Sequence, residues 1–308
     1  MKNRIYIFLL MIAIVSSCKK EIETIPNNTP PYYGEIPTVL IENYVNRIFI
    51  DLIGREPLDT EMEEEAKYLK DNDLKMEYRD SLITKLMTNT VLDTAIGDST
   101  TIYKTAYYHR IYDMTKARMI EGASNEDLSF EINILEQAIL SDSLMGGNQQ
   151  GIDKRRFEVN KLKKIISSEV LYMNGVIEIN EVYARMLYNA IYDLINMNTF
   201  NFVNASFDDL FFRFPTTDEF DNGFNMIEFN EARLLFNLPG QNKGDYIEIL
   251  TNSREYYEGM INWVYLTMLS REPTTLEKAE IMETFFYDHD LQKVQKKILM
   301  TDEYAHFD

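Results

Sequence analysis

Residues 44–61 read YVNRIFIDLIGREPLDTE, and residues 260–277 read MINWVYLTMLSREPTTLE. In both stretches an apolar run with three- and four-residue spacing ends at Arg-Glu-Pro, and a polar segment follows. The spacing predicts an amphipathic helix, and the proline disfavours helix in the residue before it. Each stretch therefore predicts a helix, a sharp turn and a second helix.

A third copy of this pattern is SFDDLFFRFPTTDE at residues 206–219. The copies also share an ending, because ILTNSREY at 249–256 is similar to ILMTDEY at 298–304, with a looser LMTNTVL at 86–92. A sequence that repeats itself predicts a repeated structural unit. We expect such units near 44–92, 204–256 and 260–304. Their turns contain Arg55, Pro57, Arg213, Pro215, Arg271 and Pro273.

The residues around each turn suggest local roles. A cation near the C-terminal end of a helix interacts favourably with the helix dipole, and we expect this role, rather than ligand binding, for the three turn arginines. Thr216 with Glu219, and Thr274 with Glu277, have the spacing of a capping box. These pairs are expected to begin the helix that follows each turn.

The same helical periodicity continues through the rest of the chain, with no sustained alternation of apolar and polar residues. We therefore predict an all-α fold, a multi-helix bundle over residues 38–308 built partly from the repeated units, with a helical insertion at about 93–200. Loops are expected at Met145–Asn148, Phe214–Pro215 and Leu238–Gly240. The expected helices span 38–54, 59–71, 75–95, 99–119, 126–144, 153–171, 178–197, 204–212, 216–236, 244–269, 275–287 and 290–303.

The N-terminal segment predicts the location of the protein. Lys2 and Arg4 precede an apolar run from Ile5 to Val15, and small residues then lead to Cys18. This order is typical of a bacterial lipoprotein signal peptide, because the apolar run is too short to span a bilayer. We predict a signal peptide at 1–17, an acylated Cys18 and a proline-rich tether at 18–37, which would attach the protein to the outer membrane by its lipid.

Composition limits the chemistry that the chain can perform. A formal net charge of −19 disfavours binding to phosphate backbones, so we exclude nucleic acid as a partner. Cys18 is the one cysteine in the sequence, so no disulfide or thiolate metal site is expected. The three histidines are His109, His289 and His306, and their spacing forms no local metal motif. We predict neither a bound metal nor a cofactor.

Two parts of the sequence resemble known protein classes. Residues 44–61, together with Tyr78–Leu82 and Lys85–Met87, and the C-terminal stretch 260–307 resemble the uncharacterised helical domains that accompany cytochrome c domains in planctomycete-type envelope proteins. That resemblance implies a helical architecture and carries no established activity. The chain lacks Cys-x-x-Cys-His, so electron transfer is not implied. The residues after Cys18 resemble the signal of surface-exposed lipoproteins in Bacteroidetes-type bacteria.

We therefore expect a non-enzymatic, lipid-anchored envelope protein that acts as an interaction or accessory subunit for another envelope protein, although the sequence leaves enzyme activity open. Acidic residues such as Glu61, Asp209 and Glu219 could form catalytic pairs, but in so acidic a chain such pairs arise by chance. The alternative is a surface glycan-binding or glycan-processing component that uses the aromatic and acidic region 200–229. Its candidate ligand surface consists of Phe207, Phe211, Phe212 and Phe220.

Overall fold

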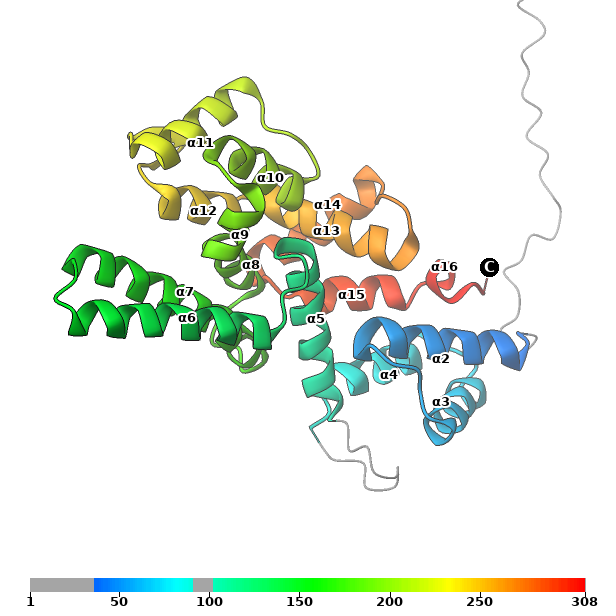
Figure 1. The fold of residues 1–308 in the computed structure, drawn as a ribbon. Coiled ribbons are helices and arrows are strands. Elements are labelled where there is room, and N and C mark those ends of the chain that lie inside the picture. Colours follow the sequence, from blue (N-terminus) through cyan, green and yellow to red (C-terminus); the bar gives the residue numbers. More distant parts are fainter. Residues whose placement is uncertain (1–35, 91–101, 308) are drawn as a thin grey trace, which may run out of the picture. The chain divides into compact units, whose positions relative to one another are not determined.

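Helices make up nearly all of the regular structure in the computed structural model, which describes residues 36–90 and 102–307 (Figure 1). These residues contain fifteen helices and one two-stranded sheet, so the all-α prediction is confirmed. The signal peptide, Cys18 and most of the tether lie outside the described residues. The helices are α2 (Thr38–Ile53), α3 (Asp59–Asp71), α4 (Met76–Thr88), α5 (Tyr103–Met119), α6 (Asn125–Leu144), α7 (Gln149–Met173), α8 (Ile179–Leu187), α9 (Ala190–Asn196), α10 (Thr199–Phe211), α11 (Thr217–Phe229), α12 (Lys243–Thr251), α13 (Arg254–Leu269), α14 (Thr275–Asp288), α15 (Leu291–Leu299) and α16 (Asp302–Ala305).

The repeated sequence forms three similar groups of helices: α2–α3–α4, α10–α11–α12 and α13–α14–α15. The first helix of each group ends at a residue in the left-handed conformation, which is Gly54, Phe212 or Ser270. The turn arginine comes directly after this residue. The left-handed residue reverses the chain, and the following proline prevents the helix from continuing.

Several expected helices differ from the structure in extent: the helix expected over 75–95 ends at Thr88, and that expected over 204–212 begins at Thr199. Three others are divided because a small polar residue starts a new helix. The expected helix 178–197 is divided between α8 and α9 at Asn189, whose side chain accepts hydrogen bonds from two following amides. Ser253 likewise starts α13 within the expected helix 244–269, and Thr301 starts α16 within 290–303. Each of these side chains caps the new helix, so a continuous helix is not formed.

The expected helix 216–236 ends at Phe229. A short antiparallel hairpin follows, with β1 (Arg233–Leu235) paired to β2 (Leu238–Gly240), so the loop expected at Leu238–Gly240 is a strand. Phe236 and Asn237 both have positive φ, as a two-residue hairpin turn requires. The Phe-Asn pair lacks the glycine that usually marks such a turn in a sequence.

Residues 102–200, expected as an insertion, contain part of the core. Helix α5 packs against α2 and α4 as well as against α7 and α8, and its Tyr107 is completely buried. Helix α8 has nine residues, as α12 and α15 do. A polar cap with a tyrosine three positions later follows all three helices, and these tyrosines are Tyr192, Tyr256 and Tyr304. The end of the repeated unit therefore occurs in this region too.

Helices α6 and α7 form a long antiparallel pair that extends away from the other helices (Figure 1). Helix α6 packs mainly against α7. The end of α7 nearest the core packs against α5 and α8, and α8 in turn packs against α12. This arrangement places α7, α8 and α12 around one groove, which is described below.

Candidate functional site

In the second and third units, the turn arginine joins two segments of its unit by ion-paired hydrogen bonds. Arg213 donates to both oxygens of Glu219 at 2.8 Å each and to both oxygens of Glu255 at 2.5 and 2.8 Å. Arg271 makes the same contacts with Glu277, at 2.7 and 3.0 Å, and with Glu303, at 2.6 and 2.7 Å. The first glutamate in each case lies in the helix after the turn, and the second lies in the shared ending of the unit.

The first unit uses a variant of this arrangement. Arg55 donates to Glu61 at 2.6 and 2.7 Å, and the hydroxyl of Tyr103 on α5 donates to the same carboxylate at 2.6 Å. Burial raises the pKa of Glu61, but hydrogen bonds from Arg55, from Tyr103 and from the Leu58 amide together bring it below its usual range. In all three units the glutamate stands six residues after the arginine, and this spacing is the sequence signal that identifies the pair.

These contacts show ion pairs of the turn arginines that the sequence did not predict. Each guanidinium bonds to glutamates and to the carbonyl of the next residue, and no described hydrogen bond joins it to a carbonyl of the preceding helix. The capping boxes of Thr216 with Glu219 and of Thr274 with Glu277 are confirmed. Hydrogen bonding by the arginine lowers the pKa of Glu219 and of Glu277 to about 2. Pro57, Pro215 and Pro273 lie in the turns between the helices.

The structure does not place the four expected ligand-surface phenylalanines on one surface. Phe207 and Phe211 are buried at 0% and 5% exposure, so the prediction is wrong for them. They pack against each other, with ring centroids 5.1 Å apart, because they are four residues apart on the inner face of α10. The Arg118 guanidinium lies over the ring of Phe212, with its central carbon 4.7 Å from the ring centroid. Phe220 is half-buried on α11.

Within the described residues, the acidic and histidine candidates pair with neighbouring side chains. Glu61 and Glu219 are held by arginines, and Asp209 accepts a hydrogen bond from Tyr192 at 2.6 Å. Within residues 36–90 and 102–307, no three His, Cys, Asp or Glu residues lie close enough together to hold a metal ion. His109 pairs with Glu169 at 3.0 Å, and His289 with Glu178.

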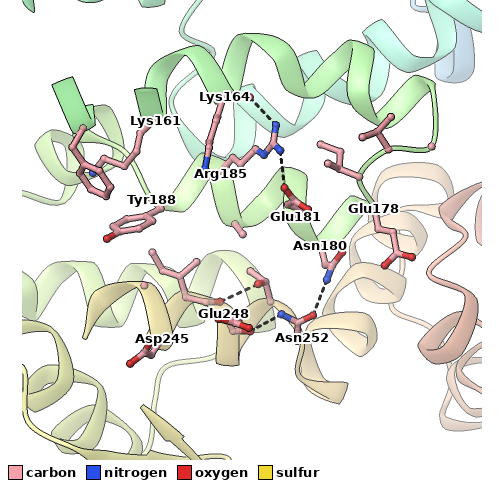
Figure 2. Close-up of a pocket in the computed structure, with 18 residues that line it drawn as sticks. Lys161, Lys164, Glu178, Asn180, Glu181, Arg185, Tyr188, Asp245, Glu248 and Asn252 are labelled. Carbon is pink, nitrogen blue, oxygen red and sulfur yellow. Dashed lines mark hydrogen bonds and ion pairs between the residues drawn. The ribbon is translucent and has the colours of Figure 1, made fainter. Parts of the chain in front are cut away.

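A groove of about 740 Å³ lies between α7, the loop that follows it, α8 and α12 (Figure 2). Lys161, Lys164 and Arg185 come from α7 and α8, and Figure 2 shows them across the groove from Asp245 and Glu248 of α12. None of these residues belongs to a motif that the sequence presents. Their positions near 157–188 and 244–252 are far apart in the chain, and no shared motif connects them.

A second feature is the outer face of α6. Leu128 and Ile132 are buried, whereas apolar side chains on the opposite side of the same helix are exposed to solvent. The exposed fractions are 67% for Phe130, 47% for Ile134, 53% for Leu140 and 79% for Leu144. Helix α6 therefore has apolar side chains on two faces, and on the outer one they are interspersed with the exposed residues Asn133, Gln137 and Ser141.

Comparison with family models, with curated proteins and with solved structures gives no match for this chain. The resemblance to the planctomycete-type helical domains therefore stays a prediction. No helix in the described part of the chain combines the length and the apolar character that crossing a bilayer requires.

Proposed function

We propose that this chain is a lipid-anchored protein of the bacterial outer membrane that acts as a non-enzymatic interaction or accessory subunit. The sequence supports the attachment: a signal peptide at 1–17, an acylated Cys18 and a tether at 18–37. The partner in this proposal is another envelope protein.

The observation that carries the proposal is the two-sided apolar character of α6. Successive residues of a helix are rotated by about 100°, so Phe130 and Leu144 lie on the side opposite Leu128 and Ile132. The inner side packs against α7, and the outer side faces solvent. A helix that is apolar on opposite sides normally has both sides covered. Exposed apolar patches are typical of protein-binding surfaces, and a partner would cover the outer side of α6.

The test is affinity purification of the tagged native lipoprotein from gently solubilised envelopes. We expect one envelope protein in stoichiometric amount, and we expect Phe130→Ser with Ile134→Ser to abolish its recovery. The matched control is Leu234→Ser with Leu276→Ser, which removes two leucines exposed at 59% and 67% elsewhere on the surface. This control should retain the partner.

Two outcomes would contradict the proposal. One is recovery of the native protein alone at high yield, and the other is retention of the partner by the α6 variant. A Cys18→Ala form, which cannot be acylated, separates the two parts of the proposal. Loss of membrane attachment in this form supports the lipid anchor whether or not the partner is found.

A further inference from the structure

The groove between α7, α8 and α12 has the size and the chemistry of a ligand site. Its volume of about 740 Å³ lies within the range of about 300–1,000 Å³ that is usual for small-molecule pockets. The groove is lined by residues of the repeat-like element α8 and of its counterpart α12, so two equivalent helices of different units form opposite walls. It is distinct from the outer face of α6.

The charges around the groove largely neutralise one another. Arg185 pairs with Glu181 at 2.6 Å, Lys161 pairs with Glu158 at 2.8 Å, and Glu178 pairs with His289. The lining as a whole contains three basic and four acidic side chains. Because cations and anions are balanced and mostly paired, the groove does not select a strongly charged ligand.

Uncharged polar groups provide hydrogen-bonding capacity at one end of the groove. The side chain of Asn180 is 8% exposed, and its Nδ2 donates to Oδ1 of Asn252 at 2.9 Å. The Oδ1 atom of Asn180 is buried and has no hydrogen-bond partner among the described residues. A buried amide oxygen without a donor is costly, and this atom is closed to the groove. The exposed amide of Asn252 is therefore the group of this pair that a ligand hydroxyl would meet. Glu248, whose main-chain carbonyl accepts a hydrogen bond from Nδ2 of Asn252 at 2.8 Å, lies beside this pair on the exposed side of α12 (Figure 2).

Aromatic rings lie at the other end of the groove. The rings of Tyr188 and Phe157 meet edge to face, with centroids 6.0 Å apart, and Phe157 is 50% exposed. The Lys161 ammonium lies 4.5 Å from the centroid of Tyr188 and 4.9 Å from that of Phe157. These cation–π contacts fix both rings in position. The half-exposed Phe157 ring, with Tyr188 against it, offers an apolar surface beside the polar groups.

We propose that this groove binds a neutral carbohydrate, a short oligosaccharide. Such a ligand presents many hydroxyl groups and no net charge, and the aliphatic face of a sugar ring packs on an aromatic side chain. Its hydroxyls hydrogen-bond to Asn252 and Glu248, and one ring lies against the aromatic pair of Phe157 and Tyr188. This binding activity goes beyond the partner role proposed above and does not depend on the outer face of α6.

The test is binding of the native lipoprotein, held in a detergent without a sugar headgroup, to an array of neutral, amino and acidic oligosaccharides and of short peptides. The strongest neutral binder is then titrated by calorimetry. We expect Glu248→Ala and Tyr188→Ala each to weaken its affinity at least tenfold. Glu248 is exposed at the surface, so its replacement tests the site without disturbing the fold.

Matched controls are Glu283→Ala and Tyr287→Ala, which change an exposed glutamate and a tyrosine that is 78% exposed on α14, away from the groove. Both controls should bind the oligosaccharide as the native protein does. The proposal is overturned if no neutral oligosaccharide binds, if acidic glycans or peptides are the ligands instead, or if the groove variants bind with native affinity.

Discussion

Arg271 joins two glutamates from separate segments, and the resulting pKa shift predicts how stability depends on pH. Hydrogen bonding by Arg271 lowers the pKa of Glu277 to about 2. A carboxyl whose pKa is lower in the folded than in the unfolded chain stabilises the fold above its unfolded pKa, near 4.5, and this contribution is lost as the pH falls toward 2. We expect Glu277→Gln to lower the free energy of unfolding by about 1–2 kcal/mol at pH 7. The stability of this variant should then fall less steeply in acid than that of the native protein.

Urea denaturation at neutral pH and at two values between pH 4.5 and pH 2 measures both effects. Glu283→Gln is the control, because Glu283 is an exposed glutamate on the same helix, α14. A Glu277→Gln variant that loses stability in acid as steeply as the native protein would show that the ion pair is not responsible.

Gly259 allows α13 to approach α10 closely. A Cβ atom at this position would lie 2.0 Å from the backbone carbonyl oxygen of Leu210, and a backbone atom cannot move aside without shifting a helix. We expect Gly259→Ala to destabilise the fold by about 3 kcal/mol or more, as severe overpacking does. Gly151→Ala is the control, because the nearest atom there is the end of the Arg155 side chain at 3.7 Å. Equal thermal stability of the two variants would contradict this explanation.

At the scale of elements, substitution by serine should destabilise the fold on the buried face of α6 and have little effect on its outer face. Phe130→Ser with Ile134→Ser removes exposed side chains, so we expect a change in unfolding free energy within about 0.5 kcal/mol per site. Ile132→Ser, on the buried face, should cost about 2–4 kcal/mol, because it leaves a cavity and buries a hydroxyl. Chemical denaturation of the purified variants measures both. A large loss from the outer-face variant would mean that this face is packed in the native protein.

The sequence predicted the repeated helices well, because their signals are local. The turn at Arg55 and Pro57 combines a helical run, a stop and a helix start within a few residues, and the helix expected over 59–71 matches α3 in both bounds. The short helices α9 and α16 were missed, because apolar periodicity continues past their polar caps Asn189 and Thr301. Periodicity alone does not show where one helix ends and another begins.

The candidate sites were less predictable, because they depend on packing between distant segments. The density of phenylalanine in 200–229 indicated an aromatic cluster, but the sequence did not show that Phe207 would face the core and Phe200 the solvent. The sequence contains no pattern that predicts the groove, because Asn180 and Asn252 meet only through the packing of α8 against α12. Such contacts between distant segments are not encoded in any local spacing.

At the scale of the whole described body, the last described residues bind helix α2. The Tyr304 hydroxyl donates to Asp51 on α2 at 2.6 Å, and the Tyr44 hydroxyl donates to the carbonyl of Leu299 at 2.9 Å. Arg79, buried on α4, donates to Asp302 at 2.7 Å. Segments more than 220 residues apart in sequence are thereby joined, so the stability of the first unit depends on the last.

Removal of residues 302–308 tests this dependence. The deletion takes away Tyr304 and Phe307, which are 0% and 4% exposed, and exposes the Tyr44 ring that packs 5.5 Å from that of Phe307. Burial of two such aromatic side chains predicts a loss of at least about 4 kcal/mol, measured by urea denaturation. Tyr304→Phe removes just the hydroxyl and its bond to Asp51, and should cost about 1–2 kcal/mol.

Tyr287→Phe is the control for the hydroxyl, since Tyr287 is 78% exposed and its replacement should leave stability unchanged. Protease digestion adds a second readout that depends on position. If the last segment supports the first unit, the deletion should expose α2, α3 and α4 to cleavage before the α6–α7 pair, because the residues that contact the lost segment lie in α2 and α4. Native stability in the deleted protein, or cleavage that begins in α6–α7, would show that the first unit folds without the last.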